Sequence, residues 1–161
     1  MDIDKNKITI RKASSDDIEM LIEFRITFLK EAQWVPTQES ELKLRKSLKD
    51  YFIKALDNST FISYIAEYEN QSAGFSGMVL REQPGNFEIP GGKTGYILNM
   101  YTVKEFRNNG IGSMLFQKLI AEAKNLKLDK IELHATTDGE PIYRKSGFKE
   151  PHDKVLELIL K

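Results

Sequence analysis

The sequence predicts a mixed α/β domain of the α+β class, in which helices flank a sheet. Two β-rich runs, residues 61–68 and 75–81, are separated by a short polar stretch, which indicates an antiparallel hairpin. Residues 96–135 then read as strand, helix and strand, an order that predicts a parallel crossover. With 161 residues and no internal repeat, the chain is expected to form one domain over residues 1–161.

The first part of the chain contains one short strand, at residues 8–11, and two helices. Residues 14–17, with the sequence SSDD, supply N-cap oxygens and early negative charge, and both favour the start of a helix. The apolar face of that helix is formed by Ile18, Leu21, Ile22, Ile26 and Leu29. Pro36 then breaks the pattern. A second amphipathic helix is predicted from Leu44, Leu48, Tyr51, Phe52 and Ala55.

A long loop is predicted between the hairpin and the next strand. Residues 83–95 contain two of the five prolines and four of the ten glycines. Loops of this length are often functional, and a loose connection between neighbouring strands is an equally good interpretation. Both interpretations stay open at this point.

The remaining elements alternate strands and helices. Residues 96–103 read as a strand, and residues 110–126 as a helix with apolar residues on more than one side, which indicates burial against a sheet. The last three predicted elements are a strand at 130–135, a short helix at 141–145 that stops at Gly147, and a strand at 155–160.

The composition excludes several kinds of site and partner. Lysine plus arginine (24) balance aspartate plus glutamate (24), which leaves no electrostatic footprint of a nucleic-acid binder. Without cysteine there is no disulfide, thiolate metal site or cysteine nucleophile, and His134 and His152 lack metal-ligand spacing, so we predict no metal. No apolar run has the length of a membrane span, and the charged N-terminal residues do not resemble a signal peptide. We therefore expect no membrane association and a cytoplasmic location.

The most informative stretch joins the strand at 96–103 to the helix that follows it. The motif RNNGIG, residues 107–112, places two glycines at the helix start. A helix N-terminus attracts anions through its unpaired N–H groups and its dipole, and glycine lets a phosphate approach because it has no Cβ. Arg107 adds a cation suited to phosphate oxygens. Neither a Walker loop nor a dinucleotide fingerprint fits, since Leu115 stands where the latter needs glycine. The spacing alone is equally typical of a plain helix start.

In their context these residues resemble the signature of the GNAT superfamily of N-acetyltransferases, in which Arg/Gln-x-x-Gly-x-Gly/Ala opens the helix after a central strand. The run ILNMYTV at 97–103 is similar to that strand. Residues 139–148, GEPIYRKSGF, resemble a later helix of the family, in which a tyrosine is followed by Gly-Phe. The resemblance covers nearly the whole chain. It implies a mostly antiparallel central sheet whose parallel central strands splay apart.

The resemblance also implies acetyl-CoA as the cosubstrate. The pyrophosphate would bind at the start of the helix, and the pantetheine arm would lie in the gap between the splayed strands. There it would pair with the backbone of the central strand as another strand does. The residues implied to bind acetyl-CoA are Met100, Tyr101, Thr102, Val103, Arg107, Asn108, Asn109, Gly110, Ile111, Gly112 and Ser113.

The implied reaction is direct transfer of the acetyl group from the thioester to a primary amine. Tyr143 matches the tyrosine that protonates the leaving thiolate in the family, although its spacing alone suits a packing role as well. Backbone N–H groups near Met100 and Tyr101 would stabilise the oxyanion. The general base is undetermined. Asn99, where many relatives carry glutamate, could only hold a water, and His134 has a suitable intrinsic pKa but also fits a structural role.

The acceptor side is the least determined part. By resemblance, the first two helices and their connection form one wall of the acceptor cleft, where Glu31 could attract a cationic amine and Trp34 could stack on it. Each residue is also ordinary by itself, as an exposed acid and a packed aromatic. We expect a small-molecule amine as acceptor. A protein or peptide amine, or a non-catalytic coenzyme A-binding module, are the alternatives. The resemblance also implies a homodimer formed through the C-terminal strand.

Overall fold

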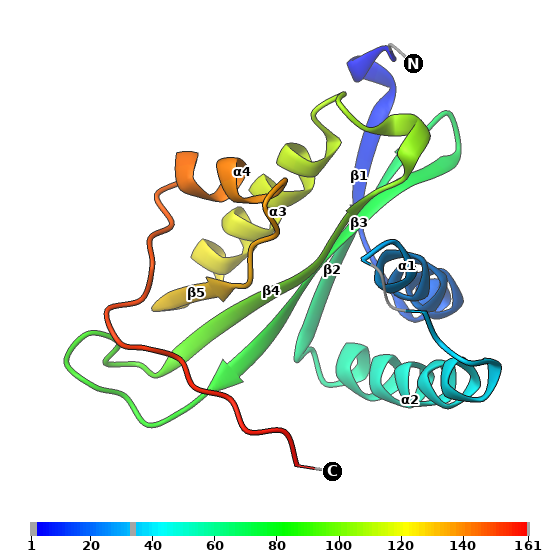
Figure 1. Ribbon diagram of the computed structural model, residues 1–161. Coiled ribbons are helices and arrows are strands. Elements are labelled where there is room, and N and C mark those ends of the chain that lie inside the picture. The colour runs from blue at the N-terminus through cyan, green and yellow to red at the C-terminus, as the bar shows by residue number, and fades with distance from the viewer. Residues whose placement is uncertain (1–2, 33–34, 161) are drawn as a thin grey trace.

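The computed structural model describes residues 3–32 and 35–160 (Figure 1). Five strands form one sheet in the order β1-β2-β3-β4-β5, and every neighbouring pair is antiparallel except β4 and β5. The strands are β1 (Ile8–Lys12), β2 (Phe61–Tyr68), β3 (Gln71–Glu82), β4 (Lys93–Thr102) and β5 (Lys130–Leu133). The α-helices are α1 (Ile18–Glu31), α2 (Gln38–Asp57), α3 (Ile111–Asn125) and α4 (Glu140–Lys145). Short 3-10 turns are η1 (Lys5–Lys7), η2 (Ser15–Asp17) and η3 (Lys104–Phe106).

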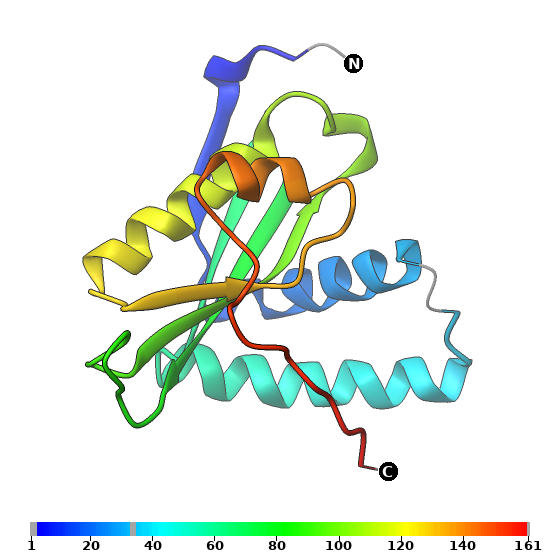
Figure 2. The same ribbon diagram turned by 60° about the vertical axis from the view of Figure 1, so that its left-hand side comes forward.

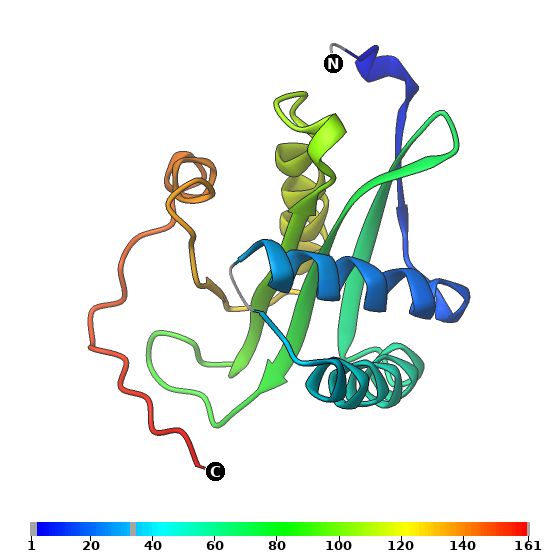
Figure 3. The same cartoon turned by 45° about the vertical axis from the view of Figure 1, so that its right-hand side comes forward.

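Helices cover both faces of the sheet, as the predicted fold class requires. α1 and α2 lie side by side on one face, whereas α3 and α4 lie on the other (Figures 2 and 3). The core under α1 and α2 contains Leu21, Phe52 and Phe75, each at most 1% exposed. The core under α3 contains Phe116 and Leu119, both fully buried. Within the described part of the chain, no helix is both long and apolar enough to cross a membrane.

The predicted hairpin is confirmed. β2 and β3 pair antiparallel up to Tyr68 and Gln71, so the connection is short. Its two residues, Glu69 and Asn70, have φ angles of 47° and 65°. Two successive positive φ values are typical of a type I′ turn, whose twist matches that of the flanking strands.

β4 separates from its parallel neighbour part of the way along. The β4–β5 ladder runs from Thr94–Lys130 to Ile97–Leu133 and stops, while β4 continues to Thr102. On its other side β4 stays paired with β3, through a register shift between Leu98 and Tyr101. A bulge of this kind bends the strand and increases its twist. The splayed parallel strands implied by the sequence are therefore present.

Several predicted segments differ from the structure, and β3 begins at Gln71 rather than at residue 75. The strand predicted at 155–160 is wrong: these residues are irregular and exposed, with Leu156 at 89%. Strand propensity alone is not enough there, because a strand needs a neighbour with which to form hydrogen bonds, and no such pairing exists within residues 35–160. β5 ends at Leu133 rather than at residue 135. β4 begins at Lys93, which shortens the predicted loop to residues 83–92.

An ion pair ties β1 to the start of α1. Arg11 donates from both terminal nitrogens to the two carboxylate oxygens of Asp17, each at 2.8 Å. Asp17 is 6% exposed and also accepts the backbone N–H of Ser14 at 2.8 Å. The hydrogen bonds from Arg11, with a further contribution from Ser14, outweigh burial and lower the pKa of Asp17.

We predict that Asp17→Asn lowers the free energy of unfolding by about 1–2 kcal/mol, since a charged hydrogen bond is lost but the pair is partly screened by water. The pKa of Asp17 is lower in the folded than in the unfolded state, so its contribution is complete above the unfolded value of about 3.9 and disappears as pH falls through the folded value. Urea unfolding near neutral pH and in acid measures this. A difference between wild type and variant that does not shrink in acid would contradict the assignment.

Candidate active site

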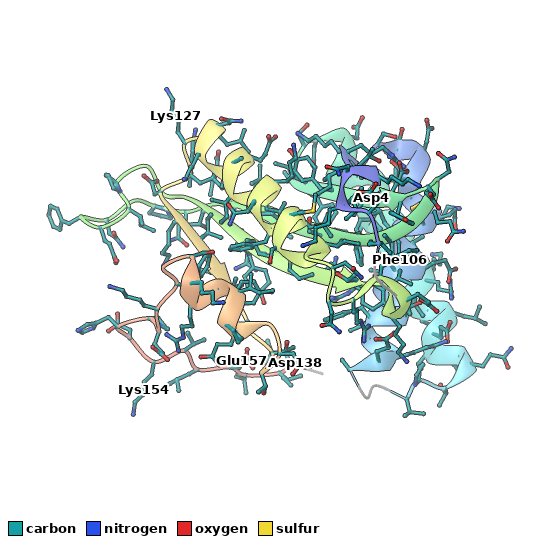
Figure 4. All side chains as sticks on the ribbon, turned by 90° about the horizontal axis from the view of Figure 1, so that it is seen from above. Asp4, Phe106, Lys127, Asp138, Lys154 and Glu157 are labelled. Carbon is teal, nitrogen blue, oxygen red and sulfur yellow. The ribbon has the colours of Figure 1, made fainter. Side chains whose placement is uncertain are left out.

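A cavity of about 660 Å³ opens where β4 and β5 part. It is lined by the C-terminal ends of α1 and β4, the turn that leads into α3, and the residues that begin α4. In Figure 4, Phe106 lies beside the start of α3 and Asp138 beside the start of α4, and both line the cavity. One cavity therefore gathers most of the stretches that the sequence singled out.

The end of β4 forms one wall. Met100, Tyr101 and Thr102 line the cavity, and the strand edge that faces β5 has no ladder partner after Ile97. An unpaired strand edge can accept an extended ligand through main-chain hydrogen bonds. Val103 differs from the other predicted residues of this strand, because it does not line the cavity and its N–H donates to Ala73 O at 2.9 Å.

The start of α3 forms the second wall. The first helical hydrogen bond joins Met114 N–H to Gly110 O at 3.0 Å, so the N–H groups of Ile111, Gly112 and Ser113 precede it. Gly110 has φ of 83°, a left-handed conformation that favours glycine. A Cβ at Gly112 would meet Thr102 Oγ1 at 3.7 Å, an ordinary contact. Gly110 is thus needed by the backbone, whereas Gly112 leaves space that the fold itself does not require.

Two asparagines shape the turn before α3. Asn108 has φ of 65°, which asparagine tolerates better than most residues. Asn109 is 5% exposed, and its side-chain amide donates to Phe106 O at 3.2 Å and Arg107 O at 2.9 Å. The Asn109 side chain therefore holds the turn in place, and any ligand contact that this residue makes must come from its backbone.

A charged cluster joins α1 to this turn. Arg107 forms an ion pair with Glu31 and also donates from Nε to Thr102 O at 2.8 Å. The hydroxyl of Tyr101 donates to Glu31 Oε1 at 2.8 Å. Burial and the bond to Glu31 raise the pKa of Tyr101 to about 12. For Glu31, burial opposes ionisation, but the bonds from Arg107 and Tyr101 outweigh it and lower the pKa. Glu31 is thus an ionised carboxylate that already has two partners.

Tyr143 lies on the α4 side of the cavity. The residue is 8% exposed, and its ring packs edge-on against Phe116 at 5.3 Å between centroids. A Cβ at Gly139 would come within 3.1 Å of the Tyr143 ring, so glycine allows α4 to begin close to it. Burial raises the pKa of Tyr143 above its ordinary value of 10.0. The phenol therefore keeps its proton at neutral pH and can donate it into the cavity.

Asn99 and His134 do not line the cavity. Asn99 is 4% exposed, has φ of 59° in the β4 bulge, and accepts a hydrogen bond from Arg25 Nη1 at 2.6 Å. His134, at the end of β5, shares a 2.6 Å hydrogen bond between its Nδ1 and the Tyr96 hydroxyl. Trp34 lies outside the described residues. In the described ranges, no group of histidines and carboxylates could hold a metal ion.

Sequence reasoning missed Arg25, which contacts Asn99, whereas Phe28, expected near the acceptor, does line the cavity. A signal for Arg25 was present. Leu21, Arg25 and Phe28 follow the i, i+4, i+7 spacing of one helix face, which places a charged residue among core positions. A charged side chain at such a position needs a hydrogen-bond or ion-pair partner. The partner comes from another element, so local spacing does not identify it.

The chain is similar to one family and to many solved structures. A model of the acetyltransferase (GNAT) family matches residues 26–148, while no curated protein matches the chain. A predicted acetyltransferase from Clostridium acetobutylicum, crystallised with acetyl-CoA, is 34% identical over 94% of this chain and 96% of that chain, with a TM-score of 0.86.

Two more distant structures have the same fold. A GCN5-related N-acetyltransferase from Ralstonia eutropha JMP134 is 24% identical over 94% of this chain and 98% of that chain, with a TM-score of 0.81. A glucosamine-6-phosphate N-acetyltransferase from Arabidopsis thaliana is 17% identical over 94% of this chain and 97% of that chain, with a TM-score of 0.67. At these identities the likeness concerns the fold alone.

Proposed function

Because the chain belongs to the GNAT family of acetyltransferases, we propose that residues 1–161 form one domain that transfers an acetyl group from acetyl-CoA directly to a primary amine of a small molecule. Membership of the family makes it an acyltransferase with acetyl-CoA as cosubstrate. The acceptor class and the roles of individual residues are the proposed part. A cytoplasmic location stays a prediction.

The main support for this proposal is that the end of β4 and the start of α3 line one cavity. The edge of β4 at Met100–Thr102, which has no ladder partner among the described residues, offers main-chain groups to the pantetheine arm, although Thr102 O already accepts from Arg107. The residues that begin α3 line the same space. The dipole of α3 favours the pyrophosphate at that end. Arg107 lies beside this position, bound to Glu31, and would exchange part of that contact for phosphate oxygens.

Three groups would carry the chemistry. The backbone near Met100 and Tyr101, at the point where β4 leaves β5, would stabilise the oxyanion of the tetrahedral intermediate. Tyr143 would protonate the thiolate as it leaves, since its pKa is raised by burial. The incoming amine must lose a proton, because a free amine with pKa about 10 is mostly protonated at neutral pH. His134, bonded to Tyr96, or a water held by Asn99 would accept that proton.

The acceptor would enter past the end of α1. Phe28, Glu31 and Ala32 form this wall of the cavity. Because Glu31 already binds Arg107 and Tyr101, its attraction for a cationic amine is weaker than that of an unpaired carboxylate. A cavity of about 660 Å³ bounded by these residues supports a small-molecule acceptor. The stacking role expected of Trp34 stays a prediction.

The first test uses Gly112→Val, because valine at Gly110 would strain the backbone whether or not a ligand binds. Acetyl-CoA at about 100 times its dissociation constant should raise the melting temperature of the wild-type protein by about 5–11 °C. Gly112→Val should melt close to wild type without ligand and lose most of the shift, since its methyl groups fill the space between α3 and Thr102. Differential scanning fluorimetry, with Gly112→Ala as the milder control, measures both. An absent wild-type shift, or a full shift in Gly112→Val, would count against the proposed site.

The second test concerns the acid. Tyr143→Phe should reduce kcat by about 100-fold or more, because the thiolate then leaves without a positioned proton donor. Its affinity for acetyl-CoA, measured by calorimetry, should stay near wild type because the phenyl ring keeps its packing on Phe116. Tyr64→Phe is a matched control, since that hydroxyl bonds to Glu122 at 3.2 Å and lies outside the cavity lining. Equal effects of the two substitutions on kcat would remove Tyr143 from the mechanism.

The third test concerns the homodimer. Val155, Leu158 and Leu160 are 69–85% exposed, in a tail that runs along the outside of the molecule (Figures 1 and 3). Such an apolar run could pair with the outer edge of β5 in a second copy. Light scattering after size exclusion should give twice the mass of one chain for wild type and a single-chain mass for Leu156→Asp combined with Leu158→Asp. A wild-type mass of one chain would rule the dimer out.

A further inference from the structure

Arg25 forms no ion pair with a carboxylate of the described residues. It projects from the face of α1 that packs on the sheet and is half-buried, with its guanidinium carbon 5.8 Å from the centre of the Phe28 ring. Its hydrogen bond, from Nη1 to Asn99 Oδ1 at 2.6 Å, goes to a neutral amide. Burial lowers the pKa of Arg25, and no carboxylate among residues 3–32 and 35–160 forms an ion pair with it.

The other arginines make this position unusual. Four of the six arginines form ion pairs with carboxylates: Arg11, Arg45, Arg107 and Arg144. In the described part of the chain the remaining two, Arg25 and Arg81, have no such pair. Arg81 lies 4.4 Å from the centre of the Tyr96 ring, and Arg25 binds Asn99 on the same strand. Two positive charges with no carboxylate partner among the described residues, here called a positive surplus, therefore lie against β4.

The location of Arg25 links this surplus to the reaction. Its partner Asn99 lies in the β4 bulge, directly before Met100, which lines the cavity. Phe28, one turn further along α1, lines the same cavity. The guanidinium therefore lies beside the β4 bulge, next to two cavity-lining residues and outside the lining itself.

We propose that Arg25 binds an anionic group, a carboxylate or a phosphate, that the acceptor amine carries. This inference rests on the proposed acetyltransferase function and names its substrate class. The planar guanidinium presents donors in a fork that fits two oxygens of either group, and one arm is held in place by Asn99. A half-buried cation with a neutral partner is costly by itself, and an anionic acceptor would offset that cost. Arg81, exposed and stacked on the Tyr96 ring, adds a second positive charge against β4.

The experiment compares matched pairs of acceptors. One arm uses free amino acids against their amides, and a second uses amino-sugar phosphates against the unphosphorylated amino sugars. Release of coenzyme A thiol reports kcat and KM for each. Binding of the same acceptors to the complex with desulfo-coenzyme A, measured by calorimetry, reports affinity without turnover. A preference for amino acids over their amides identifies the bound group as a carboxylate. A preference for amino-sugar phosphates over the unphosphorylated sugars identifies it as a phosphate.

Variants then assign the preference to Arg25. Wild type should favour the anionic member of one pair by about 10- to 100-fold in kcat/KM. Arg25→Gln should lose this preference mainly through KM, and Arg25→Lys should keep part of it. Arg45→Gln is the control of equal charge change, since Arg45 lies on α2 and pairs with Glu23 of α1 and Glu41 of α2. Melting temperatures verify that each variant folds.

Two outcomes overturn the inference. The first is that no anionic amine binds or reacts better than its neutral counterpart. The second is that Arg25→Gln weakens anionic and neutral acceptors equally, as a purely structural arginine would. Either result, together with an intact melting shift from acetyl-CoA, leaves the proposed acetyltransferase function standing. If acetyl-CoA does not raise the melting temperature of the wild-type protein, the proposed acetyltransferase function itself is contradicted, and this inference with it.

Discussion

The parting of β4 from β5 after Ile97 and Leu133 is the constraint on which the candidate site depends. Main-chain groups that a continuing ladder would use remain available beyond that point, and a cavity opens beside them. The bulge at Asn99 contributes by bending β4 while it stays paired with β3. The start of α3 then lies at the far end of the same opening, because η3 and a tight turn return the chain there. A flat, fully paired sheet with the same residues would have no such opening.

Charged groups distinguish the cavity from the region beside it. Near the start of α3, Arg107 and the helix N-terminus create positive potential, and Glu31 balances part of it. Near the bulge, Arg25 is balanced by no carboxylate of the described residues, and its pKa is lowered by burial. The two regions suit two anionic parts of a reacting complex, one on the cofactor and one on the acceptor. Since the chain has no net charge, these local fields come from placement rather than composition.

Local sequence predicted most of the fold because each signal there was strong and short in range. The turn at Glu69–Asn70 and the capping residues before α1 depend on neighbours along the chain, and both lie where expected. Residues 155–160 show the limit of this reasoning. Their apolar pattern suits a strand, but strand formation requires a partner, and pairing is a tertiary event. For the same reason β5 ends at Leu133, where its parallel partner turns away.

The sequence by itself determined the helix start with its glycines, the order of the elements, and the family that these indicate. Those features follow from backbone freedom at Gly110 and from residue spacing, which act locally. Tertiary structure decided which charges meet. Only the packing of α1 against β4 brings Arg25 to Asn99 and Glu31 to Tyr101, across 74 and 70 residues of chain respectively. Such contacts depend on distances between elements, and no local pattern encodes those distances.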